Sequence, residues 1–164
     1  MVYDIIRGGI VMAYEVRELA ETRVIGEKRS YDSIEEAQEK IQQFWTDFKQ
    51  SDQRARLTLE ADEQFQGFFG IYFPTDNGVD YMIGVSSDRE TSEWASHNIP
   101  AGKYIVFEAG RPVSREIQRV TNEAYEVIIP ASQHDLRQAP EFEYYPFGNV
   151  TAADYTAEMW IPVE

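Results

Sequence analysis

The order of the predicted elements constrains this chain most, because the same order occurs twice. Residues about 13–88 read as strand, helix, strand, strand, and residues about 97–164 read the same way. Two such halves can pair their strands side by side with both helices on one face. The opposite face, or the cleft between the halves, is then left for a ligand. The sequence predicts an α+β fold with duplicated βαββ halves, one domain over residues 12–164, and an N-terminal extension over residues 1–11.

Each half carries one helix signal. In the first half, Ser33 and Glu36 form a capping box at the start of the helix. The apolar residues that follow at helical spacing are Ile34, Ala37, Ile41, Phe44, Trp45 and Phe48. In the second half, Pro112 and Ser114 introduce a helix that ends near Pro130. Its apolar face contains Ile117, Val120, Ala124, Val127 and Ile128.

Short apolar runs between turn residues predict the strands. They cover residues 13–28, 67–73, 79–86, 103–109, 142–147 and 159–163. The turn at residues 74–78 joins two of these strands in a hairpin. Residues 49–66 are expected to form a loop with some helix, and residues 88–96 a polar linker that carries Trp94.

The net charge of the chain excludes several function classes. It is −14, from 29 acidic and 15 basic residues, so the surface repels a polyanion. We therefore expect no direct nucleic-acid partner, whereas cations are attracted. The chain has no cysteine, which excludes disulfides, thiol catalysis and cysteine-based zinc sites.

The sequence also predicts where the protein works. No apolar run approaches the ~20 residues that a membrane-spanning helix needs. The first eleven residues make a poor signal peptide because Asp4 and Arg7 interrupt the apolar stretch. We expect a cytoplasmic protein without a membrane partner. His97 and His134 lack metal-ligand spacing and no glycine-rich phosphate loop is present, so we expect neither a metal nor a cofactor.

The segment Pro140–Pro146, PEFEYYP, is the most informative candidate for a site. Strand alternation places Glu143 and Tyr145 on one face, and Phe142 and Tyr144 on the other. An acid that faces an apolar cavity has a raised pKa, and a cationic ligand restores its charge while aromatic faces add cation–π attraction. The alternative is a solvent-exposed acid on a half-buried strand, and spacing alone favours that alternative.

Other aromatic residues are candidates for the wall of a pocket, although each also fits a purely structural role. Trp160 can stack on a flat ligand or belong to the core of a central strand. The hairpin that contains Tyr72 and Tyr81 is densely aromatic, and Gly84 within it suggests a bulge or a close approach. Trp94 can close over a pocket or anchor its loop.

Four segments together resemble the GyrI-like small-molecule-binding domains, also called AraC effector-binding domains. They are YMIGV (Tyr81–Val85), IPAGKYIVFEAG (Ile99–Gly110), FEYYP (Phe142–Pro146) and EMWIPVE (Glu158–Glu164). The resemblance implies βαββ halves with pseudo-twofold symmetry, an antiparallel sheet with two helices on one face, and a central ligand cleft. It places Glu143 near the centre of an aromatic pocket. Ile128-Ile129-Pro130 departs from the family's usual Trp-Leu-Pro-like helix end, so the pocket rim is expected to differ.

Two functions follow from this resemblance and from the acid among aromatics. The first is a stand-alone module that senses or sequesters lipophilic, often cationic small molecules, linked to transcription regulation through a protein partner. Its proposed ligand-binding residues are Glu143, Tyr72, Tyr81, Trp94, Tyr104, Tyr145 and Trp160. The alternative is a hydrolase that opens cyclopropane-containing DNA-alkylating compounds, with Glu143 as the base and Tyr104 or Tyr145 as the acid. A protein-interaction role, such as protecting a topoisomerase, has no residue-level signal.

Overall fold

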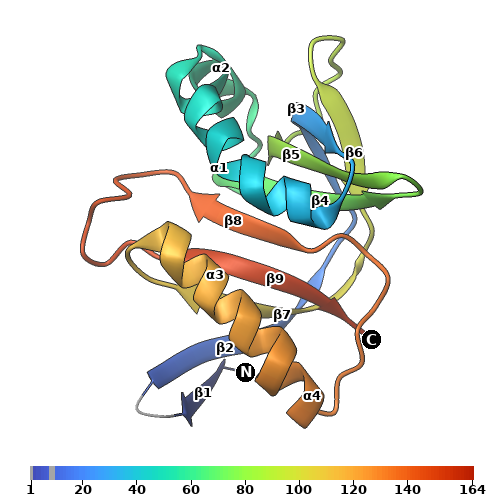
Figure 1. The fold of residues 1–164 in the computed structure, drawn as a ribbon. Coiled ribbons are helices and arrows are strands. Elements are labelled where there is room, and N and C mark those ends of the chain that lie inside the picture. Colours follow the sequence, from blue (N-terminus) through green and yellow to red (C-terminus); the bar gives the residue numbers. More distant parts are fainter. Residues whose placement is uncertain (1, 8–9) are drawn as a thin grey trace.

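The chain forms an antiparallel β-sheet with its helices packed against one face (Figure 1). The computed structural model describes residues 2–7 and 10–164, with side chains described from residue 14 onward. The strands are β1 (Val2–Arg7), β2 (Ile10–Leu19), β3 (Thr22–Tyr31), β4 (Gly67–Thr75), β5 (Gly78–Ser86), β6 (Ala95–Ile99), β7 (Gly102–Ala109), β8 (Phe142–Pro146) and β9 (Ala157–Val163). The helices are α1 (Ile34–Gln50), α2 (Gln53–Glu60), α3 (Val113–Glu123), the π-helical turn η1 (Ala124–Ile128) and α4 (Ile129–Ala131). The predicted α+β class is confirmed.

The strand order shows how the two halves of the chain meet. Over the described residues it is β1-β2-β7-β9-β8-β4-β5-β3-β6. The second half contributes β7-β9-β8 and the first half β4-β5-β3, so β8 and β4 pair at the centre of the sheet. Strands β2 and β6 each cross to the other half, where β2 pairs with β7 and β6 with β3. These exchanged strands join the halves at both sides of the central pair.

Helix α1 begins where the capping box predicts. The Ser33 hydroxyl accepts a hydrogen bond from the Glu36 backbone N–H at 3.0 Å, and the Glu36 carboxylate accepts one from the Asp32 N–H at 2.7 Å. Two of the free donors at the helix N-terminus are thus satisfied. The helix buries Ala37, Ile41, Phe44 and Phe48. This face packs against β3 and β5.

The second helix differs from its predicted form near its end. Helix α3 continues through the π-helical turn η1 into α4, and Pro130 lies within this last turn. A π-helical turn holds one more residue than an α-helical turn, which rotates the following side chains. The buried side chains are therefore Ile128 and Ile129, whereas Val127 is only partly buried. Helix α3 packs against β7 and β9.

The structure defines three segments in more detail than the sequence did. The strand-like segment at residues 13–28 is divided into β2 and β3 by residues 20–21, which lie in neither strand. The segment over residues 49–66, expected to be a loop with some helix, contains α2, whose buried face is Leu57 alone, so its apolar periodicity is weak. The expected linker over residues 88–96 ends in β6, an edge strand with only Ile99 fully buried. In both segments too few side chains are buried to leave a pattern in the sequence.

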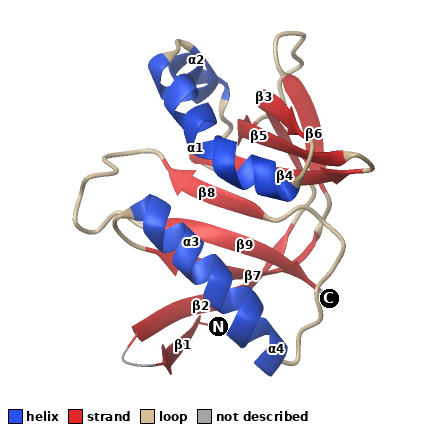
Figure 2. Cartoon of the chain, viewed as in Figure 1, coloured by secondary structure: helices blue, strands red, loops and turns tan. Residues whose placement is uncertain are grey.

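The two faces of the sheet carry different cores. On the helix-covered face, one apolar cluster lies under α1 and another under α3. The sheet curls towards its opposite face (Figure 2). On that face lies a third cluster, which contains Phe69, Phe142 and Trp160. The alternation predicted for β8 is confirmed, because Phe142 and Tyr144 belong to this third cluster and Tyr145 packs against the cluster under α3. No helix of the described chain is long and apolar enough to span a membrane.

Candidate functional site

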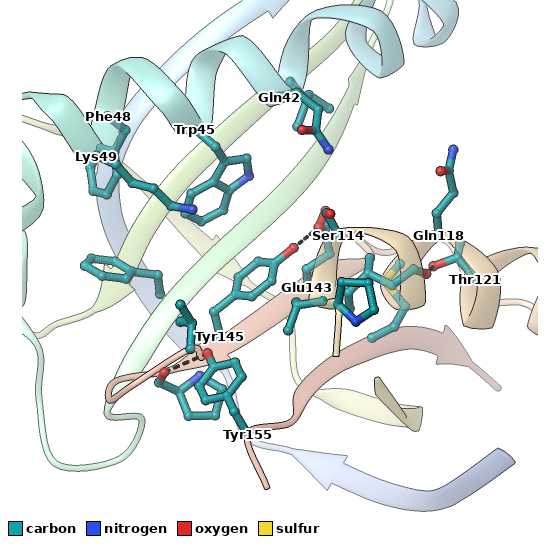
Figure 3. Close-up of a pocket in the computed structure, with 18 of the residues that line it drawn as sticks. Gln42, Trp45, Phe48, Lys49, Ser114, Gln118, Thr121, Glu143, Tyr145 and Tyr155 are labelled. Carbon is teal, nitrogen blue, oxygen red and sulfur yellow. Dashed lines mark hydrogen bonds between the residues drawn. The ribbon is translucent and has the colours of Figure 1, made fainter. Parts of the chain in front are cut away.

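A pocket of about 1130 Å³ lies on the helix-covered face, where the two halves meet. Helices α1 and α3 form its walls, and β4 and β8 contribute its floor. Residues lining it include Gln42, Trp45, Phe48, Phe68, Tyr72, Gln118, Thr121, Tyr125, Glu141, Glu143, Tyr145 and Tyr155 (Figure 3). The volume exceeds the range of roughly 300–1,000 Å³ usual for small-molecule sites. The pocket can therefore hold a ligand of drug size or larger.

Glu143 is the charged centre of this pocket. Its side chain is 6 % exposed and accepts hydrogen bonds from the Tyr145 hydroxyl at 2.6 Å and from the Tyr81 hydroxyl at 3.2 Å. Burial raises the pKa of Glu143 to about 7, although the hydrogen bonds from Tyr145 and Tyr81 oppose this shift. The nearby Glu141 carboxylate raises the pKa further. Near neutral pH, Glu143 therefore changes easily between its neutral and charged forms.

Tyr81 links Glu143 to helix α1. The Trp45 indole N–H donates to the Tyr81 hydroxyl at 2.9 Å, and that hydroxyl in turn donates to Glu143. Gly70, which pairs with Glu143 across β4 and β8, leaves the space for this contact, since a Cβ there would overlap the Tyr81 hydroxyl. Burial raises the pKa of Tyr81 well above its ordinary value, so the hydroxyl stays protonated and remains a donor.

A second carboxylate faces the same pocket. Glu141 precedes β8 by one residue and shares the pocket-facing side with Glu143. The Tyr125 hydroxyl, which is supplied by the π-helical turn η1, donates a hydrogen bond to Glu141. Burial raises the pKa of Glu141, and the bond from Tyr125 opposes that rise. Glu141 is therefore held from the second half of the chain.

The remaining wall is mainly aromatic. Tyr72 lies edge-on to Tyr81 with 4.9 Å between ring centroids, and burial raises the pKa of the Tyr72 hydroxyl. Trp45 makes a T-shaped contact with Tyr145 at 5.1 Å, and the Lys49 ammonium lies 5.9 Å from the Trp45 ring centroid. Figure 3 shows Trp45 and Tyr145 beside Glu143, with Lys49 farther along α1. Such ring faces attract an organic cation by its charge and by its apolar surface.

The structure brings together some of the site residues expected from the sequence. Glu143, Tyr72 and Tyr145 line the pocket, and Tyr81 lies directly behind Glu143. Spacing alone favoured an exposed Glu143, and that reading was wrong because the side chain is buried.

Three of the expected residues lie outside the pocket lining. Tyr104 and Trp160 belong to the cluster on the opposite face of the sheet, where the Tyr104 hydroxyl donates to the Pro140 carbonyl at 3.0 Å. Trp94 donates its indole N–H to Gln53 at 2.7 Å and so ties its loop to α2. For Trp160 and Trp94 these contacts correspond to the structural roles that were considered as alternatives, whereas Tyr104 was expected only in the pocket.

Sequence reasoning missed most of the pocket lining, and three of the missed residues, Trp45, Glu141 and Tyr125, matter most for the site. Trp45 was assigned only to the apolar face of the first helix, yet it is partly buried and faces the pocket. Glu141 could have been found by extending the alternation of β8 by two residues. Tyr125 had no usable signal, because its direction depends on the π-helical turn.

The fold and the pocket together define an effector-binding protein, one that holds a small molecule between two halves of an α+β domain. The chain belongs to the Cass2 family of integron-associated effector binding proteins, whose model matches residues 15–163. The resemblance to GyrI-like effector-binding domains is thereby confirmed. No curated protein matches the chain.

Several solved structures are similar to this chain. One is a Staphylococcus aureus MU50 protein described as a candidate bacterial transcription regulator, with 30 % identity, a TM-score of 0.84, and coverage of 92 % of this chain and 97 % of that chain. A second is SAV2435 bound to tetraphenylphosphonium, also with 30 % identity and a TM-score of 0.84, covering 92 % and 93 % of the two chains. The Vibrio cholerae integron cassette protein VCH_CASS2 shares the fold, with 20 % identity, a TM-score of 0.61, and coverage of 92 % and 95 %.

Proposed function

We propose that this protein binds lipophilic cations in the pocket between α1 and α3, as a sensor or sequestering protein linked to transcription regulation. The observation that carries the proposal is the Glu143 carboxylate, buried among hydroxyl and indole groups in an aromatic-walled pocket. A similar protein, SAV2435, has been solved bound to tetraphenylphosphonium. The net charge of −14 also attracts cations over a distance.

The chemistry of Glu143 explains why a cation fits better than a neutral ligand. A buried carboxylate without a countercharge is costly to ionise, which is why its pKa is raised to about 7. A bound cation supplies that countercharge and returns the group to its ionised form. Tyr145 and Tyr81 keep the carboxylate in place, and Tyr72 offers a ring surface. We assign ligand contact to Glu143, Tyr72 and Tyr145, and a positioning role to Tyr81.

The cleft follows from the arrangement of the halves. We propose that residues 12–164 form one domain whose βαββ halves are related by pseudo-twofold symmetry. The mirrored strand order and the exchange of β2 and β6 support this relation. Helices α1 and α3 then occupy equivalent places, and the ligand cleft lies between them.

Calorimetric titration with tetraphenylphosphonium tests the proposal. We expect saturable binding at one site, and the variant Glu143→Gln should bind at least roughly tenfold more weakly, equal to about 1.4 kcal/mol. The control is Glu108→Gln, which makes the same change in net charge at an exposed position of β7. Equal affinities of Glu143→Gln and Glu108→Gln would reject the role of Glu143.

The hydrolase remains a second candidate because the pKa of Glu143 is about 7, which suits a general base at neutral pH. Tyr145, 2.6 Å from Glu143, is the candidate acid in the pocket, whereas Tyr104 lies on the opposite face. Incubation with a cyclopropane-containing alkylating compound separates the two functions. Repeated product formation that is lost in Glu143→Gln supports the enzyme, and stoichiometric binding without product supports the binder.

A further inference from the structure

Two carboxylates without an ion-pair partner among the described residues line the pocket, Glu143 buried and Glu141 partly buried. Among the described side chains, no Lys or Arg forms an ion pair with Glu141 or Glu143. The two carboxylates accept hydrogen bonds from tyrosine hydroxyls. These bonds stabilise an anion but do not neutralise it. A single cation leaves one of the two acids uncompensated.

The tyrosines that donate hydrogen bonds to the two acids come from opposite halves of the molecule. Tyr81 of β5 in the first half reaches Glu143, whereas Tyr125 of η1 in the second half reaches Glu141. Because strand residues two apart lie about 7 Å from one another, the carboxylates occupy separate positions along the floor. The pocket, about 1130 Å³ in volume and lined by residues of both helices, has room for a ligand that covers both positions.

We propose that Glu141 and Tyr125 form a second cation subsite beside Glu143, so that the preferred ligand class is an amphiphile with two cationic centres. The inference rests on the proposed function, because it assumes that Glu143 takes one of the two centres. Each cationic centre pairs with one carboxylate, and the apolar spacer lies against the aromatic wall between α1 and α3. When both carboxylates are paired, both can be ionised without an uncompensated charge in the pocket.

The Tyr125 position explains how the second subsite is built. The π-helical turn over Ala124–Ile128 interrupts the regular α-helix where Tyr125 reaches Glu141. Thr121 and Gln118, one and two turns earlier, also line the pocket, so α3 presents a continuous polar edge to it. Turns of this kind often occur where a helix must direct a side chain into a functional site.

Titration with bis(trimethylammonium) alkanes of increasing spacer length tests the inference, with alkyltrimethylammonium ions of equal length as matched single-charge probes. In the wild-type protein the best double cation should bind roughly tenfold more tightly than its single-charge counterpart. In Glu141→Gln this advantage should disappear, whereas the charge-matched Glu108→Gln control should retain it. In Glu143→Gln the affinity for both probe classes should fall.

The outcomes separate this inference from the proposed function. Equal wild-type affinity for the two probe classes overturns the second subsite, and so does an advantage that Glu141→Gln retains. Either result leaves single-cation binding at Glu143 intact. If the wild-type protein binds no single cation, including tetraphenylphosphonium, both proposals fail. The wild-type comparison needs no variant, so the test stands even if Glu141→Gln does not fold.

Discussion

The raised pKa of Glu143 predicts that this residue makes the protein less stable at neutral pH and above than at acidic pH. The folded-state pKa is about 7, and the ordinary value is 4.5. Below pH 4.5 the group is protonated in both folded and unfolded states and costs nothing. As the pH rises from 4.5 towards 7, the unfolded chain releases the proton while the folded protein retains it, so unfolding becomes more favourable.

The size of this effect follows from the two pKa values. Each pKa unit corresponds to about 1.4 kcal/mol, so the cost reaches about 3 kcal/mol at pH 8 and is about 1 kcal/mol at pH 5. Glutamine has nearly the same shape and no charge. The stability of Glu143→Gln relative to the wild-type protein should therefore increase by about 2 kcal/mol between pH 5 and pH 8. For a chain of this length, that corresponds to a gain of roughly 4–8 °C in Tm.

Urea unfolding followed by circular dichroism at pH 5, 6, 7 and 8 measures this difference. The absolute stability of Glu143→Gln depends on how its amide bonds to Tyr145 and Tyr81, but the pH dependence of the difference does not. Glu108→Gln is the control, because it makes the same substitution at an exposed position of β7. A difference for Glu143→Gln that stays constant from pH 5 to pH 8 would refute the assignment of a raised pKa.

Three further predictions test the pocket and its supports. Tetraphenylphosphonium should bind roughly tenfold more weakly at pH 6 than at pH 8, because Glu143 must lose its proton to pair with the cation. Calorimetric titration measures this difference, and Glu143→Gln should show no such dependence on pH. Gly70→Ala should displace the Tyr81 hydroxyl, reduce cation affinity and destabilise the fold by about 1–3 kcal/mol, measured by titration and urea unfolding. Ser33→Ala should cost about 1 kcal/mol of stability by removing the N-cap bond to Glu36 while cation affinity is unchanged.

Much of the local structure could be predicted from the sequence because it depends on neighbouring residues. The capping box located the start of α1, and the turn at residues 74–78 located the β4–β5 hairpin. Alternation in β8 placed Glu143 and Phe142 on opposite faces. These signals state which residues share a face, but spacing alone favoured an exposed Glu143, and it was the family resemblance that placed it at the centre of a pocket.

Which face holds the pocket could not be predicted from local signals. Trp160 and Tyr104 are as aromatic as Trp45 and Tyr145, yet the first two fill the core on the opposite face. The difference arises because the sheet curls and closes over one of its own faces, whereas the other face is covered only where α1 and α3 pack. Such closure depends on strand pairing between distant segments, including the exchange of β2 and β6.

The position of the pocket follows from where each half packs its helix on the sheet. Each half uses its helix to cover its own outer strands: α1 packs on β3 and β5, and α3 packs on β7 and β9. The halves meet through β4 and β8, which lie between these two packed areas (Figure 2). A side chain that points from β8 towards the helices therefore enters the space between them, where Glu143 is buried by the aromatic walls of the two halves. On the proposed function, the ligand site lies at this junction of the halves, and the carboxylate that β8 carries there selects cationic ligands.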